Sequence, residues 1–125
     1  MQVVEAVLDA VASGELRTGD RLPSVREAAI EALVNPNTIS RAWRELEVLG
    51  VVEGKAGAGV FVTAEGPENA RRERRRATLS TLKQALDEAL RSGHSPAVVE
   101  EETARAVKRA AGAARSPADE KGGRR

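Results

Sequence analysis

The sequence contains no cysteine and almost no aromatic residues, with one tryptophan, one phenylalanine and no tyrosine among 125 residues. The absence of cysteine excludes disulfides, thiolate metal sites and cysteine nucleophiles. With so few aromatic residues, Val, Leu, Ile and Ala must supply the core. No apolar run is long enough to span a bilayer, and no charged start followed by an apolar segment indicates a signal peptide. We therefore expect a cytoplasmic protein with one small domain, or one domain plus an appendage.

The sequence also lacks the residue clusters that catalysis or metal binding requires. The single histidine, His94, stands alone in an expected turn, whereas a zinc site needs several ligands close together. The acidic run at residues 100–102 lies in the first turns of an expected helix, where carboxylates interact favourably with the helix dipole. No spacing typical of a nucleophile elbow or a catalytic triad occurs. We therefore expect no enzyme, no cofactor and no metal site.

Positive charge is scarce in the first half of the chain. The net charge is +1, and residues 1–66 hold six Lys and Arg against ten Asp and Glu. If residues 1–66, here called the head, bind DNA, their few cations must lie close to it, and the non-specific affinity should be weak. Residues 67–76 contain five arginines and two glutamates. This run either follows a DNA backbone or is the solvated start of a long helix, and charge runs are more often solvated.

Residues 35–49 predict an amphipathic helix whose first residues favour a helix N-terminus. Asn35 suits the N-cap position and Pro36 the first helical position. The apolar stripe comprises Ile39, Ala42, Trp43, Leu46 and Leu49. The opposite face carries Asn37, Thr38, Ser40, Arg41 and Arg44. Amides, hydroxyls and guanidinium groups suit a DNA major groove, although ordinary amphipathic helices also have polar outer faces.

Two further helices are expected before this one. Residues 2–13 place valines and a leucine on one side, and Ser24 caps a second helix that runs to about Leu33, with Glu27 completing the cap. Between them, a short strand is expected at residues 21–22, with its leucine pointing inward. The second and third helices are separated by so few residues that they form the outline of a helix-turn-helix.

A β-hairpin is expected directly after the third helix. Its strands are residues 51–53 and 60–63, joined by a glycine-rich turn over residues 54–59. Glycines allow the backbone to approach a phosphate or a minor groove closely, although a loose hairpin tip is the alternative. Three helices followed by a hairpin predict a winged helix-turn-helix over residues 1–63.

The remaining chain predicts two long helices. A linker over residues 64–68 leads into a helix from about Glu68 to Ser92, and a second helix restarts at Ser95. Their apolar stripes should pack as an α-hairpin, and the residual stripe should pair with a second copy.

The predicted organisation is therefore mainly α with a small β-hairpin: a winged helix-turn-helix followed by a C-terminal two-helix dimerisation hairpin. The helical dimerisation region covers residues 69–115. Residues 116–125, rich in charge and glycine, are expected to form a disordered tail.

Three motifs resemble the GntR family of bacterial transcription regulators. They are Arg21-Leu22-Pro23-Ser24-Val25-Arg26-Glu27, Asn35-Pro36-Asn37-Thr38-Ile39-Ser40-Arg41-Ala42 and Arg44-Glu45-Leu46-Glu47. The resemblance covers roughly residues 2–63, and the short two-helix C-terminal part is similar to the YtrA subfamily. It implies a homodimeric, sequence-specific repressor that reads a pseudo-palindromic double-stranded DNA operator. By analogy with that subfamily, the target includes an ABC transporter operon, while no small-molecule effector is identified.

The resemblance also implies which residues contact DNA. Position by position, these are Arg26, Asn37, Thr38, Ser40 and Gly57. We add Arg41, Arg44 and Lys55 on physical grounds, as cations within reach of phosphate. Trp43 shares the apolar stripe, so we assign it to the core, with an indole contact to DNA as the alternative.

The sequence departs from the family pattern at three places. Leu33 stands where members usually have a glycine, and a positive φ there would cost about 1 kcal/mol or more. The tip of the hairpin, the wing of this fold, has Ala56 and Ala58 where arginines are common. Members often have several residues before the first helix, whereas Met1 stands at its start here, which is compatible with a shortened N-terminus. The acidic head and this arginine-free tip favour an alternative, a winged-helix protein-interaction module without specific DNA binding.

Overall fold

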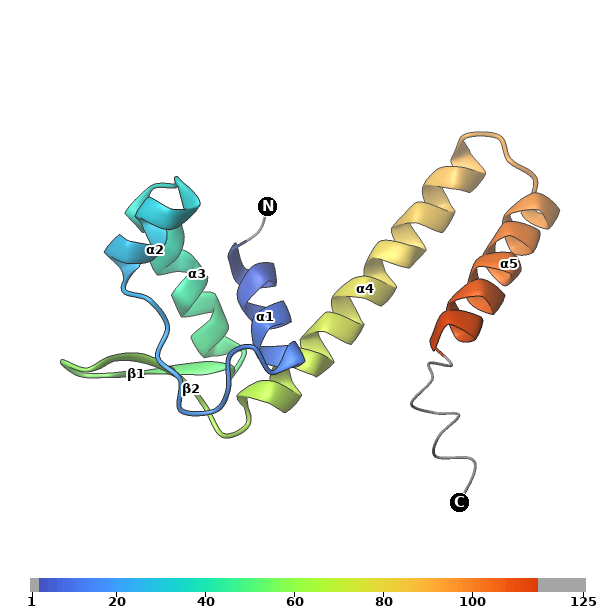
Figure 1. The fold of residues 1–125 in the computed structure, drawn as a ribbon. Helices are drawn as coiled ribbons and strands as arrows, with labels where there is room; N and C mark the ends of the chain where they lie inside the picture. The colour runs from blue at the N-terminus through green and yellow to red at the C-terminus, as the bar shows by residue number, and fades with distance from the viewer. Residues whose placement is uncertain (1–2, 115–125) are drawn as a thin grey trace, which may run out of the picture. The chain divides into compact units, whose positions relative to one another are not determined.

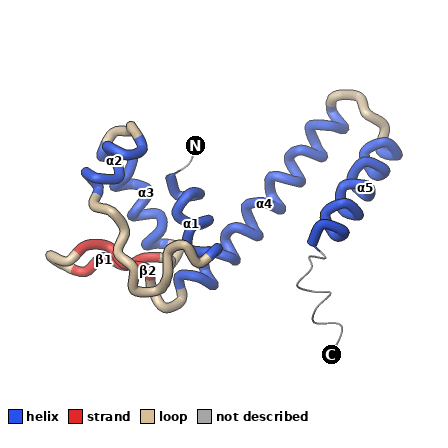
Figure 2. The backbone as a smooth tube through the Cα atoms, in the orientation of Figure 1, coloured by secondary structure: helices blue, strands red, loops and turns tan. Residues whose placement is uncertain are grey.

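The computed structural model describes residues 3–114 of the chain, and these form five helices and one two-stranded hairpin (Figure 1). The elements are α1 (Val3–Ser13), α2 (Val25–Ala32), α3 (Pro36–Val48), β1 (Val52–Lys55), β2 (Gly59–Val62), α4 (Gly66–Arg91) and α5 (Pro96–Ala114). Figure 2 shows that the strands are confined to the hairpin between α3 and α4. The prediction of a mainly helical chain with a small hairpin is confirmed. The chain divides into two compact units, and the boundary between them lies after Leu79, within α4.

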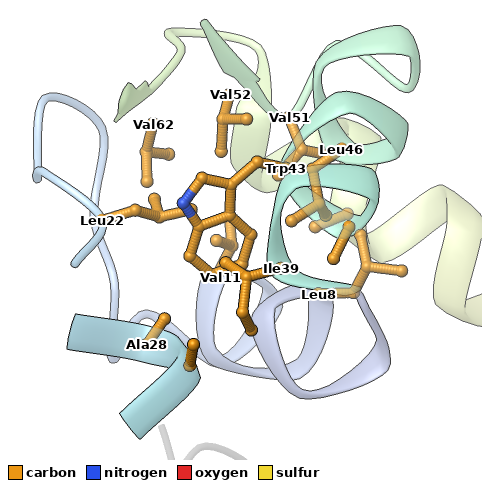
Figure 3. Packing of buried hydrophobic residues seen from close by; sticks show 13 residues of the cluster. Leu8, Val11, Leu22, Ala28, Ile39, Trp43, Leu46, Val51, Val52 and Val62 are labelled. Atoms are coloured by element: carbon orange, nitrogen blue, oxygen red, sulfur yellow. The ribbon is translucent and has the colours of Figure 1, made fainter. Parts of the chain in front are cut away.

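The hydrophobic core of the first unit lies between α1, α2, α3 and the hairpin (Figure 3). Ile39 and Leu46 of α3 are fully buried, and the valines of the hairpin pack against them. Trp43 is buried in the same cluster, and its Nε1 donates a hydrogen bond to the Pro23 carbonyl at 3.3 Å. The assignment of Trp43 to the core is confirmed, and its one polar atom is satisfied without DNA.

The turn of the hairpin is shorter than the sequence predicts, because both strands extend further toward the tip. Gly54 pairs with Val60 and Lys55 pairs with Gly59, so both glycines belong to the strands. The predicted turn over residues 54–59 is therefore wrong at its ends, and the tip consists of residues 56–58. Cross-strand hydrogen bonding extends the ladder into residues whose intrinsic strand preference is poor.

The segment before α2, where the sequence predicts a short strand, adds a short third partner to the hairpin. Arg21 forms an isolated antiparallel bridge with Phe61, and the Leu22 N–H donates to the Val60 carbonyl at 2.8 Å. Leu22 is 2% exposed and points into the core. The wing is thus held to the head by backbone hydrogen bonds as well as by its apolar face.

The fourth helix begins inside the segment predicted as a linker. α4 starts at Gly66 rather than near Glu68, and Ala70 is completely buried. A Cβ at Gly66 would lie 2.6 Å from the Val51 carbonyl oxygen, so only glycine fits against the hairpin base. The Asn69 Nδ2 atom also donates to the Gly50 carbonyl at 3.0 Å. These tertiary contacts make residues 66–68 helical, which local sequence patterns do not reveal.

The second unit contains the end of α4 and the whole of α5. The Ser95 Oγ accepts a hydrogen bond from the Val98 N–H at 3.2 Å, which confirms the predicted cap. No residue of α5 is buried, and Leu82, Leu90 and Val107 are 46%, 43% and 62% exposed. The apolar stripes are therefore only partly covered within one chain. The predicted tail over residues 116–125 lies outside the described residues.

The turn between α2 and α3 contains the only non-glycine residue with a positive φ among residues 3–114. Leu33 has φ 56° and ψ 45°, and its N–H closes the C-terminus of α2. Its side chain is 90% exposed, so no packing compensates for the left-handed conformation. The conformation expected for this family position is thus kept, with leucine in place of glycine.

Replacing Leu33 with glycine should raise the free energy of unfolding by about 1 kcal/mol, because glycine adopts this conformation without a Cβ clash. Urea denaturation at fixed protein concentration measures the change. Glu31→Gly, which places glycine in exposed helix, is the matched control and should lower stability by about 1 kcal/mol. A Leu33→Gly variant no more stable than the parent would show that Leu33 stores no strain.

Candidate nucleic-acid interface

The start of α3 is fixed by its own first residues. The Asn35 Oδ1 accepts a hydrogen bond from the Asn37 N–H at 2.8 Å, and the Thr38 N–H donates to the Asn35 carbonyl at 2.9 Å. Pro36 occupies the first helical position. The predicted cap is confirmed, and it positions the polar side chains of the first turn.

One face of α3 carries unpaired polar side chains. Asn37, Arg41 and Arg44 are all exposed and follow one another at spacings of four and three residues. That spacing places them on one face, opposite the buried stripe that anchors the helix. Because the stripe is buried, α3 cannot rotate about its axis, and its polar face stays exposed to solvent.

Thr38 and Ser40 lie on opposite flanks of that face, since residues two apart in a helix point about 200° apart. Ser40 is half-buried. Thr38 is exposed and lines a shallow hollow together with Arg41, Glu45 and the first valines of α1. The structure therefore brings Asn37, Arg41 and Arg44 together, with Thr38 and Ser40 at the edges.

The remaining predicted contacts come from α2 and the wing. Arg26 is exposed in the first turn of α2. Gly57 at the wing tip has φ 75° with open space around it, and Lys55 lies over the Phe61 ring at 5.1 Å from its centroid. All of these positions belong to the first unit, in which the hairpin projects from the base of α3 (Figure 1).

The cations of the head are free of carboxylate partners. None of the salt bridges formed among residues 3–114 includes Arg26, Arg41, Arg44 or Lys55. By contrast, several head carboxylates have internal partners. Asp20 accepts from the Arg17 N–H, and Glu47 accepts from the Gly54 N–H. The four cations are therefore not engaged in ion pairs within the described residues, although the head as a whole is acidic.

The arginine run of α4 is engaged internally. Arg74 contacts Glu5 at 3.0 Å and Asp9 at 2.5 Å, which ties the start of α4 to α1. Arg71, Arg72 and Arg76 each pair with an acid or an amide one turn earlier, and Arg75 pairs with Glu68 two turns earlier. The hydrogen bond from Arg76 to Glu73 raises the pKa of Arg76 above its ordinary value. Of the two interpretations of this run, the structure favours a helix start over a DNA contact.

One cation near the wing was not among the predicted site residues. Arg21 is exposed, and its side chain lies against Gly59 of β2. The sequence shows Arg21 only as part of a motif and a short strand, because the register that brings it to the wing is a tertiary property. The one indication in the sequence was that Arg21 lies in the segment predicted as a short strand, which could pair with another strand.

No helix within residues 3–114 combines the length and apolar character needed to cross a membrane. The same residues contain no group of three or more His, Asp or Glu side chains arranged to hold a metal ion.

Comparisons with known proteins agree with this geometry. Residues 1–62 match the family described as "Bacterial regulatory proteins, gntR family". The chain is 47% identical over 62 residues to the uncharacterized HTH-type transcriptional regulator YhcF of Bacillus subtilis, covering 50% of this chain and 51% of YhcF. It thus spans about half the length of YhcF. It is 32% identical over 93 residues to the HTH-type transcriptional repressor YtrA of the same organism, covering 74% of this chain and 68% of YtrA.

Two solved structures are similar over most of the chain. A transcriptional regulator from Oenococcus oeni has a TM-score of 0.65 and 31% identity, covering 85% of this chain and 88% of that one. A GntR family transcriptional regulator from Listeria monocytogenes has a TM-score of 0.67 and 26% identity, covering 83% and 90%. The likeness therefore extends beyond the winged helix into the C-terminal helices.

Replacing Asn35 with alanine should lower the free energy of unfolding by about 1 kcal/mol, because the Asn37 N–H loses its acceptor. Asn37→Ala is the matched control; it removes no hydrogen bond of the cap and should stay within about 0.5 kcal/mol of the parent. Thermal or urea denaturation measures both. Equal stability of the two variants would contradict the role of Asn35 as the cap.

Proposed function

The chain belongs to the GntR family of bacterial regulatory proteins, and we propose that it is a homodimeric repressor that reads a pseudo-palindromic DNA operator through α3 and the wing. It is a transcriptional regulator and not an enzyme. We place its action in the cytoplasm, where it would meet its DNA.

The observation that carries the proposal is the outward face of α3. In a head with few cations, Arg41 and Arg44 stand exposed and unpaired beside the Asn37 amide, on a helix fixed by a buried stripe. Guanidinium groups pair with phosphate or with guanine, and amides pair with adenine in the major groove. The arrangement suits a helix that enters the groove with its N-terminal turns.

The other predicted contacts fit around that helix. Arg26 could form a bidentate contact with guanine or sit on a phosphate. Thr38 and Ser40 offer hydroxyls at the two edges of the reading face. In the wing, Gly57 permits close backbone approach and Lys55 supplies a charge for the flanking backbone or minor groove.

The exposed apolar positions of the second unit support dimer formation. Leu82, Leu90 and Val107 are each more than two-fifths exposed, and α5 buries no residue within one chain. A second copy that covers these stripes would complete a helical bundle. A symmetric pair of heads would then match an operator with two related half-sites.

A protein-interaction module remains the second candidate function. Two features favour it: the acidic balance of residues 1–66 and the wing tip without arginine. Salt dependence separates the two functions, because binding through phosphates weakens steeply as salt rises. By analogy with the YtrA subfamily, we extend the first proposal to an ABC transporter operon as a regulated target, with the effector left unassigned.

Arg26→Ala and Thr38→Ala should each weaken binding to the DNA upstream of the protein's own gene about tenfold or more, because a good base contact contributes roughly 1–3 kcal/mol. Fluorescence anisotropy with random DNA as competitor measures this loss. Arg71→Ala is the matched control; it removes the same charge from a residue already paired with Glu68, and it should bind normally. Normal affinity in folded Arg26→Ala and Thr38→Ala proteins would overturn the site assignment.

Leu82→Asp should raise the dimer dissociation constant at least tenfold, since a two-fold interface would bury the substituted position twice. Sedimentation equilibrium measures the constant. Gln84→Asp is the control, because Gln84 faces away from the apolar stripe by helical spacing. A Leu82→Asp protein that stays dimeric, or a parent protein that is monomeric, would contradict dimerisation through these helices.

A further inference from the structure

The tip of the wing has no cation of its own. Residues 56–58 are Ala, Gly and Ala, and Lys55 at the end of β1 is the one positive residue of the hairpin. A wing that touches DNA needs positive charge near its tip, because phosphate contacts supply most of the sequence-independent affinity. The structure brings a second cation there from another part of the chain.

The backbone of Arg21 is fixed at the edge of β2. Arg21 bridges Phe61, and the neighbouring hydrogen bonds join Leu22 to Val60 at 2.8 Å and Val62 to Asp20 at 2.9 Å. Side chains alternate between the two faces of a strand. Because Leu22 points into the core, Arg21 points to the outer face of the wing.

The side chain of Arg21 runs from this position toward the tip. A Cβ at Gly59 would lie 2.7 Å from the Arg21 Nε and 3.5 Å from its Cζ, although Gly59 is two residues nearer the tip than Phe61. Glycine at this position therefore leaves room for the guanidinium along the strand. Arg21 is exposed and takes part in no salt bridge among residues 3–114.

Lys55 reaches the same face from the other strand. It pairs directly with Gly59, and its Nζ lies 5.1 Å from the centroid of the Phe61 ring, which limits where the ammonium can go. Directly opposed residues of an antiparallel pair share one face. Glu53 is on this face too, opposite Phe61, but forms no ion pair with either cation.

We propose that Arg21 and Lys55 form a two-cation phosphate site beside the wing tip, and that Arg21 supplies the charge that the tip itself lacks. The inference rests on the proposed function, since the phosphate is that of the DNA backbone flanking a half-site. The guanidinium can bind a phosphate through two parallel N–H donors, and the ammonium adds a second point charge. The site contributes affinity that does not depend on base sequence.

The test compares Arg21→Gln with Arg17→Gln, an equal charge change at an exposed arginine four residues earlier. Each full-length protein is titrated by fluorescence anisotropy, over a range of salt, against the upstream duplex and a scrambled duplex of equal composition. For Arg21→Gln we expect several-fold weaker binding to both duplexes and a salt slope smaller by about one, as for a single lost phosphate contact. Arg21→Lys and Arg17→Gln should keep the parent slope.

Two results would overturn the site. One is a slope for Arg21→Gln equal to that of Arg17→Gln. The other is weaker binding on the upstream duplex alone, which would mark Arg21 as a base reader. Melting curves confirm that the variants are folded. A parent protein that binds neither duplex overturns the proposed function and this site together. A parent protein that binds both duplexes equally overturns operator specificity, and the salt slope of Arg21→Gln then decides on the phosphate site.

Discussion

The burial of one stripe of α3 is the constraint on which the rest of the head depends. Ile39 and Leu46 are fully inaccessible to solvent, and Trp43 is anchored by both its ring and its Nε1 hydrogen bond to Pro23. A helix held in this way cannot rotate about its axis, so its polar face is presented in a single orientation. The cap at Asn35 fixes the N-terminus of α3. A helix that reads a groove with its first turns needs both a fixed rotation and a fixed start.

Charge is distributed so that a head with more acids than bases still offers cations that take part in no ion pair. Arg74 pairs with Glu5 and Asp9 and so joins α4 to α1, while the remaining arginines of that run pair with side chains one or two turns earlier in α4 itself. The cations of α3 have no such partners. One arginine of the densest basic segment therefore attaches α4 to α1, and the sparse cations of the head are left for a ligand.

Features governed by local rules could be predicted from the sequence, and those set by distant contacts could not. The two caps follow from capping chemistry and the buried stripe follows from helical spacing. Both caps and four of the five stripe residues were confirmed, whereas Leu49 is half-buried at the C-cap of α3. The start of α4 at Gly66 depends on a close approach to the Val51 carbonyl, which no local pattern encodes. Arg21 reaches the wing only through the register of its bridge to β2. The DNA contacts themselves stay predictions, since they require a partner molecule.

Hydroxyl-radical footprinting of the DNA upstream of the protein's own gene tests the central claim most directly. A homodimer that reads a pseudo-palindrome through two copies of α3 should protect two related half-sites, with centres about 10–10.5 base pairs apart or a multiple of that spacing. The protection should survive excess random DNA and fade as salt rises. A single protected segment, or protection that random DNA removes as readily as the upstream sequence does, would contradict the account.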